Sequence, residues 1–242
     1  MDHIASLRSD GHALTAAARS VDIDTPIAQC PGWTMGRLVG HTGKVLQRTE
    51  LCVRLGLDAP PADDLAPKLP RDSSLFDVFD DLVDQLAETL AAADPTGPSW
   101  NFTGTDQTNA FWVRRMAHEV EIHRWDAQSA TGSTPDGFDP SHAVDGIDEL
   151  LTVLIPVRSA IENPALDGSF HLHCTDAAGE WLTVFTKGEP TTSREHAKGD
   201  IAVRGPATSL YLWAWNRLPA SDGDIEVIGD DSLLEGWASI VP

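Results

Sequence analysis

The sequence has few cysteines, few basic residues and no long hydrophobic run. Cys30, Cys52 and Cys174 are scattered singly through 242 residues, without a Cys-x-x-Cys pair. An odd and scattered set argues against a disulfide framework and against a thiolate metal cluster. Cys30, near a predicted turn, is the one cysteine considered as a nucleophile, although the sequence places no activating base beside any of the three.

Basic residues are outnumbered: 17 Lys and Arg stand against 37 Asp and Glu, so the formal net charge is -20. Because binding to a phosphate backbone requires concentrated Lys and Arg, we expect neither nucleic acid nor a membrane as a partner. The first residues lack a basic region followed by an apolar stretch, and no segment resembles a transmembrane helix. These features predict a cytoplasmic protein.

Helical periodicity dominates the first half of the chain. The helical blocks cover residues 3–20, 34–56, 73–93 and 108–131. Segments rich in Pro and Gly separate the second block from the third and the third from the fourth. Four long helices predict a bundle, a fold that builds metal sites from inward side chains on facing helices.

The segment from Thr131 to Pro140 concentrates turn-forming residues and marks a domain boundary. We expect one domain over residues 1–138 and a second over residues 142–242. The second domain starts with a helix over residues 142–161, in which Pro156 is a kink or an end. We expect strands near residues 170–175, 181–186, 200–204 and 225–228, and a helix near residues 206–217. The predicted fold class is α plus α+β.

The strongest candidate site lies in the fourth helical block. Glu119 and His123 are four residues apart and therefore project side by side from one helix face. Together with Trp112 and Met116 they follow the 4-3-4 spacing of a core-facing stripe. A carboxylate in such a stripe must be paired, protonated or bound to a cation. The alternatives are a solvated Glu/His face and an ordinary salt bridge between Glu119 and Arg115.

His41 is a further candidate in the second helical block. The run Cys30-Pro31-Gly32-Trp33-Thr34 reads as a turn that ends in a helix N-cap, and His41 follows Thr34 by two helical turns among apolar residues. A histidine on an apolar face is either a hydrogen-bonded core residue or a metal ligand. The local pattern leaves both interpretations open.

Three motifs, in the order in which they occur along the chain, resemble those of the mycothiol-dependent maleylpyruvate isomerase family, which belongs to the DinB-like metalloenzymes. They are the Cys-Pro-Gly-Trp-Thr run with His41, the Glu119/His123 phrase ending in Arg124-Trp125-Asp126, and the segment from Gly205 to Arg217. The resemblance extends from about residue 5 to residue 238. It implies a DinB-like four-helix bundle followed by a small α+β domain. It also implies a divalent metal, usually zinc, held by His41, Glu119 and His123.

The resemblance further implies an enzyme with mycothiol as thiol cosubstrate. A metal-bound thiolate would attack a small electrophile, giving cis-trans isomerisation or thiol S-transfer, and the sequence does not choose between them. Two imidazoles and one carboxylate leave an open position, as in catalytic zinc sites, but do not exclude iron, nickel or manganese. Arg217 would hold an anionic substrate such as a carboxylate; a cation favouring a helix C-terminus is the other interpretation. Asp126 is either an acceptor for a ligating histidine or a helix-terminating residue.

Two other functions fit the same residues. In a metal-dependent hydrolase, the open position would activate water instead of a thiol. In a binding protein, the bundle would sequester a small molecule without turnover. His171 and His173 share a strand face, but we expect them on the solvent side of an edge hairpin, with no carboxylate at a ligand spacing, and therefore expect no second metal site there.

Overall fold

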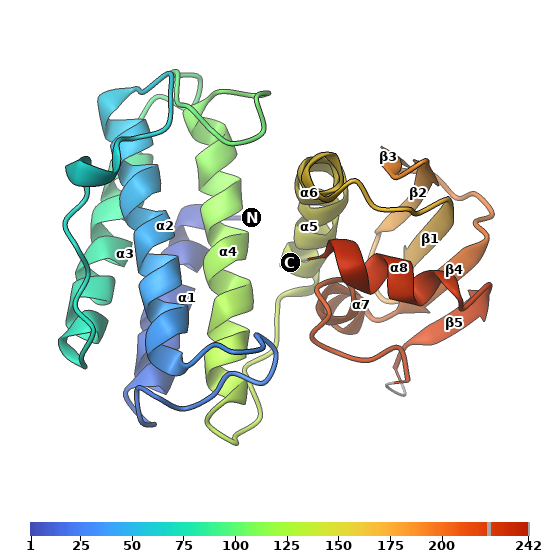
Figure 1. The fold of residues 1–242 in the computed structure, drawn as a ribbon, viewed down its shortest axis with the longest axis horizontal. Helices are drawn as coiled ribbons and strands as arrows, with labels where there is room; N and C mark the ends of the chain where they lie inside the picture. Colours follow the sequence, from blue (N-terminus) through green and yellow to red (C-terminus); the bar gives the residue numbers. More distant parts are fainter. Residues whose placement is uncertain (222–223, 242) are drawn as a thin grey trace. The chain divides into compact units, whose positions relative to one another are not determined.

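The computed structural model describes residues 1–221 and 224–241. The chain forms two compact units, one over Asp2–Asp136 and one from Gly137 onward together with Met1. The first is helical and the second contains a small sheet (Figure 1), which confirms the predicted fold class. Pro242, the last residue of the predicted second domain, lies outside the described residues. Among the described helices, none has the length and hydrophobicity needed to cross a bilayer.

The first unit is built from four long helices that match the predicted blocks to within three residues. They are α1 (His3–Ala18), α2 (Met35–Leu55), α3 (Ser74–Ala92) and α4 (Asn109–Ser129). Helix α1 lies against α3 and α4, and α2 lies against the same two helices. A short 3-10 turn, η1 (Asp63–Leu65), lies in the connection between α2 and α3.

The ends of α2 follow directly from its sequence. Thr34 is the N-cap, as predicted, and its hydroxyl accepts a hydrogen bond from the backbone N–H of Arg37 at 3.4 Å. Gly56 ends the helix in the left-handed conformation, with φ of 57°, which a residue without Cβ adopts at low cost. These two caps fix where α2 begins and ends, and therefore where His41 stands along it.

Helix α4 is buried on more than one face. Besides the predicted stripe, the side chains of His118, Glu121 and Arg124 are buried on other sides of the helix. A spacing argument that assigns one face to the core therefore underestimates how enclosed this helix is. Helix α4 therefore carries many polar side chains that are wholly or largely enclosed, of which Glu119 and His123 are two.

The second unit begins with a helical segment of three parts. Helix α5 (Pro140–Glu149) leads into a π-helical turn, η2 (Leu150–Leu154), and then into α6 (Ile155–Glu162). Pro156 lies in the first turn of α6, where a missing backbone N–H is tolerated. The helix expected over residues 142–161 is thus present, and its irregularity lies in the turn before Pro156.

A five-stranded sheet follows, in the order β3-β2-β1-β4-β5. Its strands are β1 (Gly168–Cys174), β2 (Glu180–Thr186), β3 (Glu189–Ser193), β4 (Ile201–Gly205) and β5 (Glu226–Gly229). Strands β1 and β4 are parallel, and the other neighbours are antiparallel. Helix α7 (Ala207–Ala214) follows β4, and α8 (Leu233–Ile240) follows β5. The sequence analysis missed β3 and α8.

The two faces of the sheet differ in chemistry. Phe170 and Leu172 on β1 are fully buried, and the Phe170 ring lies 5.1 Å from that of Trp237 on α8. His171 and His173 alternate with them and therefore lie on the opposite face. The expectation of an edge hairpin for these histidines is wrong, because β1 is the central strand.

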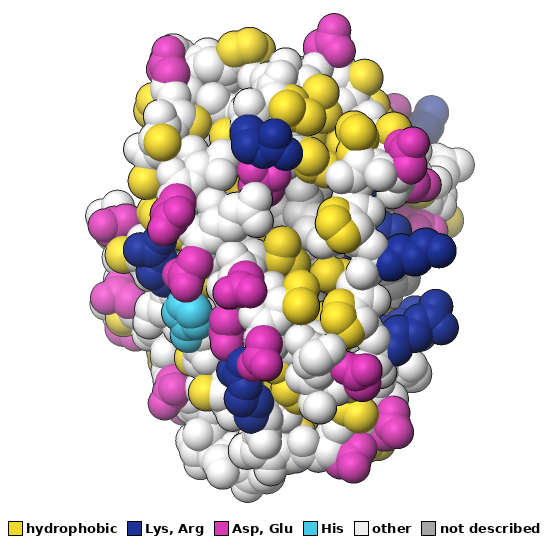
Figure 2. Space-filling view, turned by 90° about the vertical axis from the view of Figure 1, so that its left-hand side faces the viewer, with side chains coloured by type: hydrophobic (Ala, Val, Ile, Leu, Met, Phe, Trp, Pro, Cys, Tyr) yellow, Lys and Arg dark blue, Asp and Glu magenta, His cyan; other side chains and the backbone are white. Residues whose placement is uncertain are grey.

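Acidic side chains are spread over the face of the bundle drawn in Figure 2, with Lys and Arg scattered among them. Ion pairs also form between side chains of this unit: Arg19 contacts Asp77 and Asp80 at 2.7 Å each. Exposed ion pairs of this kind contribute little to stability. The excess of acidic residues in the composition is therefore a property of a solvated surface.

Candidate metal centre in the helical bundle

Three side chains predicted from the sequence converge within the bundle. The Nε2 atom of His41 on α2 lies 3.5 Å from Oε1 of Glu119 on α4, and Nε2 of His123 lies 3.5 Å from the same oxygen. One potential ligand atom from each residue lies within 4.8 Å of the other two. The geometry therefore brings together two imidazole nitrogens and a carboxylate oxygen.

The three residues differ in exposure. The side chain of His123 is 9% exposed and that of Glu119 is 16% exposed, whereas that of His41 is 43% exposed. His41 therefore stands at the solvent edge of the group instead of on a wholly apolar face. Such a site can admit a small molecule from solvent beside His41, while Glu119 and His123 stay largely enclosed.

Glu119 divides its two oxygens between different partners. Oε2 accepts a hydrogen bond from the guanidinium of Arg115 at 3.0 Å, while Oε1 faces the two histidines. The salt bridge to Arg115, considered as an alternative to a metal site, is thus present on the other oxygen. This salt bridge leaves Oε1 free of Arg115, so the two interpretations of the Glu119 pattern do not exclude each other.

His123 is oriented by Asp126 one turn further along α4. The distance between His123 Nδ1 and Asp126 Oδ2 is 3.0 Å, and the Asp126 side chain is fully buried. A carboxylate that accepts from Nδ1–H fixes the tautomer of the ring and leaves Nε2 available as a ligand. Of the two roles considered for Asp126, the contact matches that of an acceptor for the histidine.

The ionisable groups in this cluster strongly shift one another's pKa values. Burial lowers the pKa of His123, but its hydrogen bonds to Asp126 and Glu119 raise it more, to about 9. Burial raises the pKa of Glu119, but hydrogen bonds from His123 and His41 and the charges of His123 and Arg115 bring it well below its usual range. Without a cation, a proton on His123 balances the Glu119 carboxylate. A divalent cation would take the place of that proton.

An aromatic side chain that the sequence analysis did not single out for the site covers the two histidines. The Trp33 ring lies 4.8 Å from the His41 ring and 6.2 Å from the His123 ring, measured between centroids. The guanidinium of Arg37 lies 5.1 Å from the centroid of the Trp33 ring. Arg37 precedes His41 by four residues on α2, so both side chains project from one side of the helix. This spacing could have identified Arg37 from the sequence.

A pocket of about 440 Å³ opens beside His41 within the first unit. Its lining includes two cationic side chains, Arg37 and Arg71, and one carboxylate, that of Asp24. The volume lies within the range of small-molecule sites. The two arginines make the pocket suited to an anionic ligand.

None of the three cysteines forms a disulfide bond. Cys30 Sγ lies 3.5 Å from Asp126 Oδ2, so the one cysteine considered as a nucleophile lies next to the candidate centre, with a carboxylate as neighbour. Cys52 and Cys174 are buried, and burial raises the pKa of Cys52 to about 11 and that of Cys174 to about 12. A carboxylate neighbour does not favour a thiolate, so none of these contacts indicates a reactive cysteine.

Arg217 lies in the second unit, just after α7. Its guanidinium donates a hydrogen bond to the backbone carbonyl of Trp215 at 2.7 Å and lies 5.8 Å from the centroid of the Trp215 ring. Helix α7 ends at Ala214, so Arg217 belongs to the following segment and not to the last helical turn. Its hydrogen bond to the carbonyl of Trp215, the C-cap residue of α7, is a contact that cations make at helix C-termini, so both interpretations of Arg217 stand.

Comparison with protein families gives two matches that together span most of the chain. The model described as the mycothiol maleylpyruvate isomerase N-terminal domain matches residues 4–128, and that of the C-terminal domain of the same proteins matches residues 141–236. Comparison with curated proteins gives no match.

Among solved structures, the fold is similar to crystal structures of the mycothiol-dependent maleylpyruvate isomerase and of its variant with one histidine replaced by alanine. Each is 12% identical in sequence, with a TM-score of 0.65 over 93% of this chain and 91% of that chain. At this identity, the likeness shows a shared fold.

Proposed function

Because this chain belongs to the mycothiol maleylpyruvate isomerase family, an enzyme family, we propose that it is a metal-dependent enzyme that joins mycothiol to a small electrophile. The metal would be zinc or a similar divalent cation, held by His41, Glu119 and His123. The proposed domains are residues 1–138, with the metal site, and residues 142–242. The proposed partners are a low-molecular-weight thiol and a small electrophilic substrate, and the proposed location is the cytoplasm.

The observation that carries this proposal is the position of Glu119 between two imidazoles. Its Oε1 atom lies 3.5 Å from Nε2 of both His41 and His123. Two nitrogens and one oxygen are a donor set that zinc accepts, and three protein ligands leave a coordination position open, as in catalytic sites. Zinc held there would supply positive charge that lowers the pKa of a thiol at the open position.

The surrounding residues hold the ligands in place. Asp126 accepts from His123 and sets which ring nitrogen faces Glu119. Arg115 holds the second oxygen of Glu119, so the carboxylate cannot rotate freely. The Trp33 ring contacts both imidazoles. Such supporting contacts typically change metal affinity about 10-fold to 100-fold when removed.

Activation of the thiol accounts for only part of the rate. A free thiol with a pKa of about 8.5 is about 3% ionised at neutral pH, so full ionisation raises the thiolate fraction by about thirtyfold at most. The remainder must come from positioning thiolate and electrophile together. Arg37 and Arg71, in the pocket beside His41, are suited to hold an anionic group of either molecule.

The proposed reaction is addition of sulfur to an activated carbon-carbon double bond. The thiolate forms a C–S bond while the π electron pair moves into the conjugated carbonyl group. Rotation about the resulting single bond, followed by loss of the same thiolate, regenerates the double bond as its trans isomer. If the thiol stays and the carbon takes a proton, the outcome is S-transfer. Arg217 is the proposed group for a substrate carboxylate.

The test combines metal content with turnover. Purified protein is analysed by elemental mass spectrometry and assayed with maleylpyruvate and mycothiol, beside His41→Ala, His123→Ala and a control, His12→Ala, whose ring contacts Asp80 and Asp84 on the bundle surface. We expect near-stoichiometric metal and thiol-dependent isomerisation in wild type and control, and loss of both in the two site variants.

Other outcomes would overturn parts of the proposal. Protein that neither contains nor takes up metal excludes the metal site. Turnover with metal but without thiol indicates a hydrolase that activates water. Saturable binding of small molecules without turnover, unchanged in His123→Ala, indicates a binding protein.

A further inference from the structure

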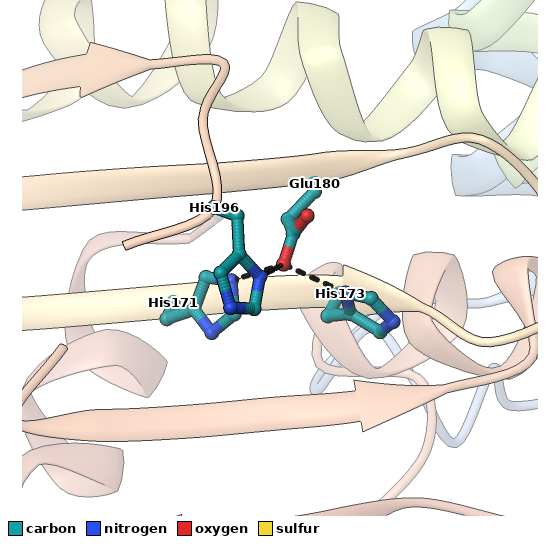
Figure 3. A group of neighbouring side chains, drawn as sticks. All are labelled: His171, His173, Glu180 and His196. Atoms are coloured by element: carbon teal, nitrogen blue, oxygen red, sulfur yellow. Dashed lines mark hydrogen bonds and ion pairs between the residues drawn. The ribbon is translucent and has the colours of Figure 1, made fainter. Parts of the chain in front are cut away.

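A second group of potential ligands lies in the C-terminal unit, separate from the bundle residues in sequence. Figure 3 shows three imidazoles pointing at one carboxylate. Oε1 of Glu180 lies 2.8 Å from Nε2 of His171, 2.8 Å from Nδ1 of His173 and 2.5 Å from Nδ1 of His196. One ligand atom from each of the four residues lies within 4.8 Å of the others.

The sheet assembles this group from three parts of the chain. His171 and His173 lie two residues apart on β1 and share a face, and Glu180 pairs directly with His173 in the register of β1 and β2. His196 comes from the segment between β3 and β4. The expectation that no carboxylate lies at a ligand spacing is therefore wrong, because Glu180 on the neighbouring strand β2 supplies one.

The segment that carries His196 is anchored next to it. Arg194 makes two hydrogen bonds to Asp148 on α5, at 2.5 Å and 2.8 Å. The side chain of His196 is 82% exposed, whereas those of His171 and Glu180 are 11% and 24% exposed. An exposed histidine on an anchored segment therefore reaches back to a half-buried pair on the sheet.

The arrangement of these four donor atoms suits a divalent cation. Three imidazole nitrogens and one carboxylate oxygen form a four-donor set, and zinc bonds such atoms at about 2.0–2.2 Å in a tetrahedron. Tetrahedral ligand atoms at those bond lengths lie about 3.4 Å apart, a separation that atoms already within 4.8 Å of one another can reach by small side-chain rotations. A single oxygen facing three imidazoles is otherwise a demanding arrangement, because all three rings must present N–H groups to it at once.

Nearby charges do not compete with a cation at this position. Arg204 on β4 is opposite His173 in the register, and its guanidinium is paired with Glu226 on β5 at 3.3 Å. Arg194 is held by Asp148. Both neighbouring cations are thus balanced by carboxylates of their own, and Glu180 is left to the three histidines.

We propose that His171, His173, Glu180 and His196 form a second metal site, which binds a divalent cation of the zinc class and fastens the segment after β3 to the sheet. Four protein ligands fill a tetrahedral shell, so this site is closed and structural. It holds the C-terminal unit together and takes no part in thiol chemistry.

The test uses a background in which the two histidines of the bundle site are removed, His41→Ala with His123→Ala. This protein is stripped of metal and titrated with Co²⁺, whose visible absorption reports tetrahedral nitrogen and oxygen ligation, and with Zn²⁺ in competition. We expect one tight equivalent. Adding His173→Ala or His196→Ala should weaken binding at least tenfold and abolish the visible bands, whereas Lys198→Ala, an exposed residue of the same segment, should leave both unchanged.

A second readout follows the segment itself. Trypsin cleaves after Arg194 and Lys198, and we expect Zn²⁺ to slow cleavage there at least fivefold in the background protein but not after His196→Ala. Circular dichroism checks that each variant is folded. Absence of a tight equivalent in the folded background protein, or binding that survives His173→Ala and His196→Ala, overturns the proposal. Because both histidines of the bundle site are absent throughout, this result is independent of the test of the proposed function.

Discussion

Asp126 Oδ2 lies 3.0 Å from Nδ1 of His123, and both side chains belong to the same buried turn of α4. The contact matters because it decides which ring nitrogen of His123 faces Glu119. A histidine whose Nδ1–H is held by a carboxylate offers Nε2 as a better electron donor to a cation. The proposed metal site therefore depends on a residue that does not touch the metal.

The first prediction concerns Asp126→Asn. The amide keeps the size of the side chain but removes its charge, so His123 loses the partner that fixes its tautomer. We expect zinc affinity at the bundle site to fall about 10-fold to 100-fold, with the fold retained. Competitive titration with a zinc chelator measures the change.

The control for this variant is Asp81→Asn, at an exposed position on α3. It removes the same charge from the chain without changing the site. Equal affinity in Asp126→Asn and in the control would contradict the orienting role of Asp126.

The second prediction concerns Glu119→Gln in metal-free protein. The change removes the charge that faces Arg115 and the two histidines, although the amide oxygen can still accept a hydrogen bond. We expect the free energy of unfolding to drop by about 1–3 kcal/mol near neutral pH, measured by urea denaturation. Glu88→Gln, at an exposed position on α3, is the control and should change it little.

This loss should depend on pH. The pKa of Glu119 in the folded protein lies well below its usual range, so the charge stabilises the fold above the unfolded pKa of about 4.3 and ceases to do so as pH falls through the folded pKa. His123 is protonated up to about pH 9. The difference between wild type and Glu119→Gln should therefore be largest between about pH 5 and pH 8 and shrink in acid. A difference that stays the same from neutral pH down to well below about pH 4 would show that charge is not its cause.

The sequence predicted the bundle and the grouping of His41, Glu119 and His123 to a large extent, for identifiable reasons. Thr34 and Gly56 fix the ends of α2 by local backbone chemistry, which a sequence pattern expresses directly. Glu119 and His123 are neighbours on one helix, so their proximity follows from helix geometry alone. The position of His41 next to them depends on the packing of two helices, and the sequence suggested it only through the resemblance to a family.

The parts that sequence analysis missed depend on contacts between distant segments. The pairing of His173 with Glu180 is set by strand register, which depends on the geometry of the connecting turn together with the hydrophobic alternation of both strands. Strand β3 contains Pro190 and several polar residues, as edge strands can, and so gave no strand signal. Trp33 was read as part of a turn, and its position over the histidines is a tertiary contact.

The third prediction concerns the thiols. Burial raises the pKa of Cys52 to about 11 and that of Cys174 to about 12, and both are closed to solvent. Since the thiolate is the reactive form, iodoacetamide at pH 8 should label at most Cys30 in the folded protein and all three cysteines in urea. Peptide mass spectrometry gives the labelled positions. Rapid labelling of Cys52 in folded protein would contradict the packing of α2.

The same shifts predict how stability changes in alkali. An unfolded thiol ionises near pH 8.5, whereas the folded thiols stay protonated to higher pH. The unfolded state therefore binds fewer protons, and stability falls as pH rises from about 8.5 towards the folded values. The fall should be smaller in Cys52→Ser than in wild type when urea denaturation is compared at pH 8 and pH 10.5. Cys30→Ser, whose thiol is not fully buried, serves as the matched control.

The fourth prediction separates the two proposed positions for an anionic substrate group. Arg71 lines the pocket beside His41, and Arg217 lies after α7 with its guanidinium against Trp215. Loss of a charge-assisted hydrogen bond costs about 1.5–3 kcal/mol. If the pocket holds a carboxylate, we expect Arg71→Ala to raise KM about tenfold or more with kcat little changed.

The control for this variant is Arg48→Ala, which removes a partly exposed arginine paired with Asp63 on the same unit. A substrate with its carboxylate esterified adds a second readout, because it should be equally poor with wild type and Arg71→Ala if that arginine binds the carboxylate. If instead only Arg217→Ala raises KM for the acid and not for the ester, the carboxylate is held by the second unit. In that case the arginines beside His41 are left to bind the thiol cosubstrate, and a KM for mycothiol raised by Arg71→Ala would establish that assignment.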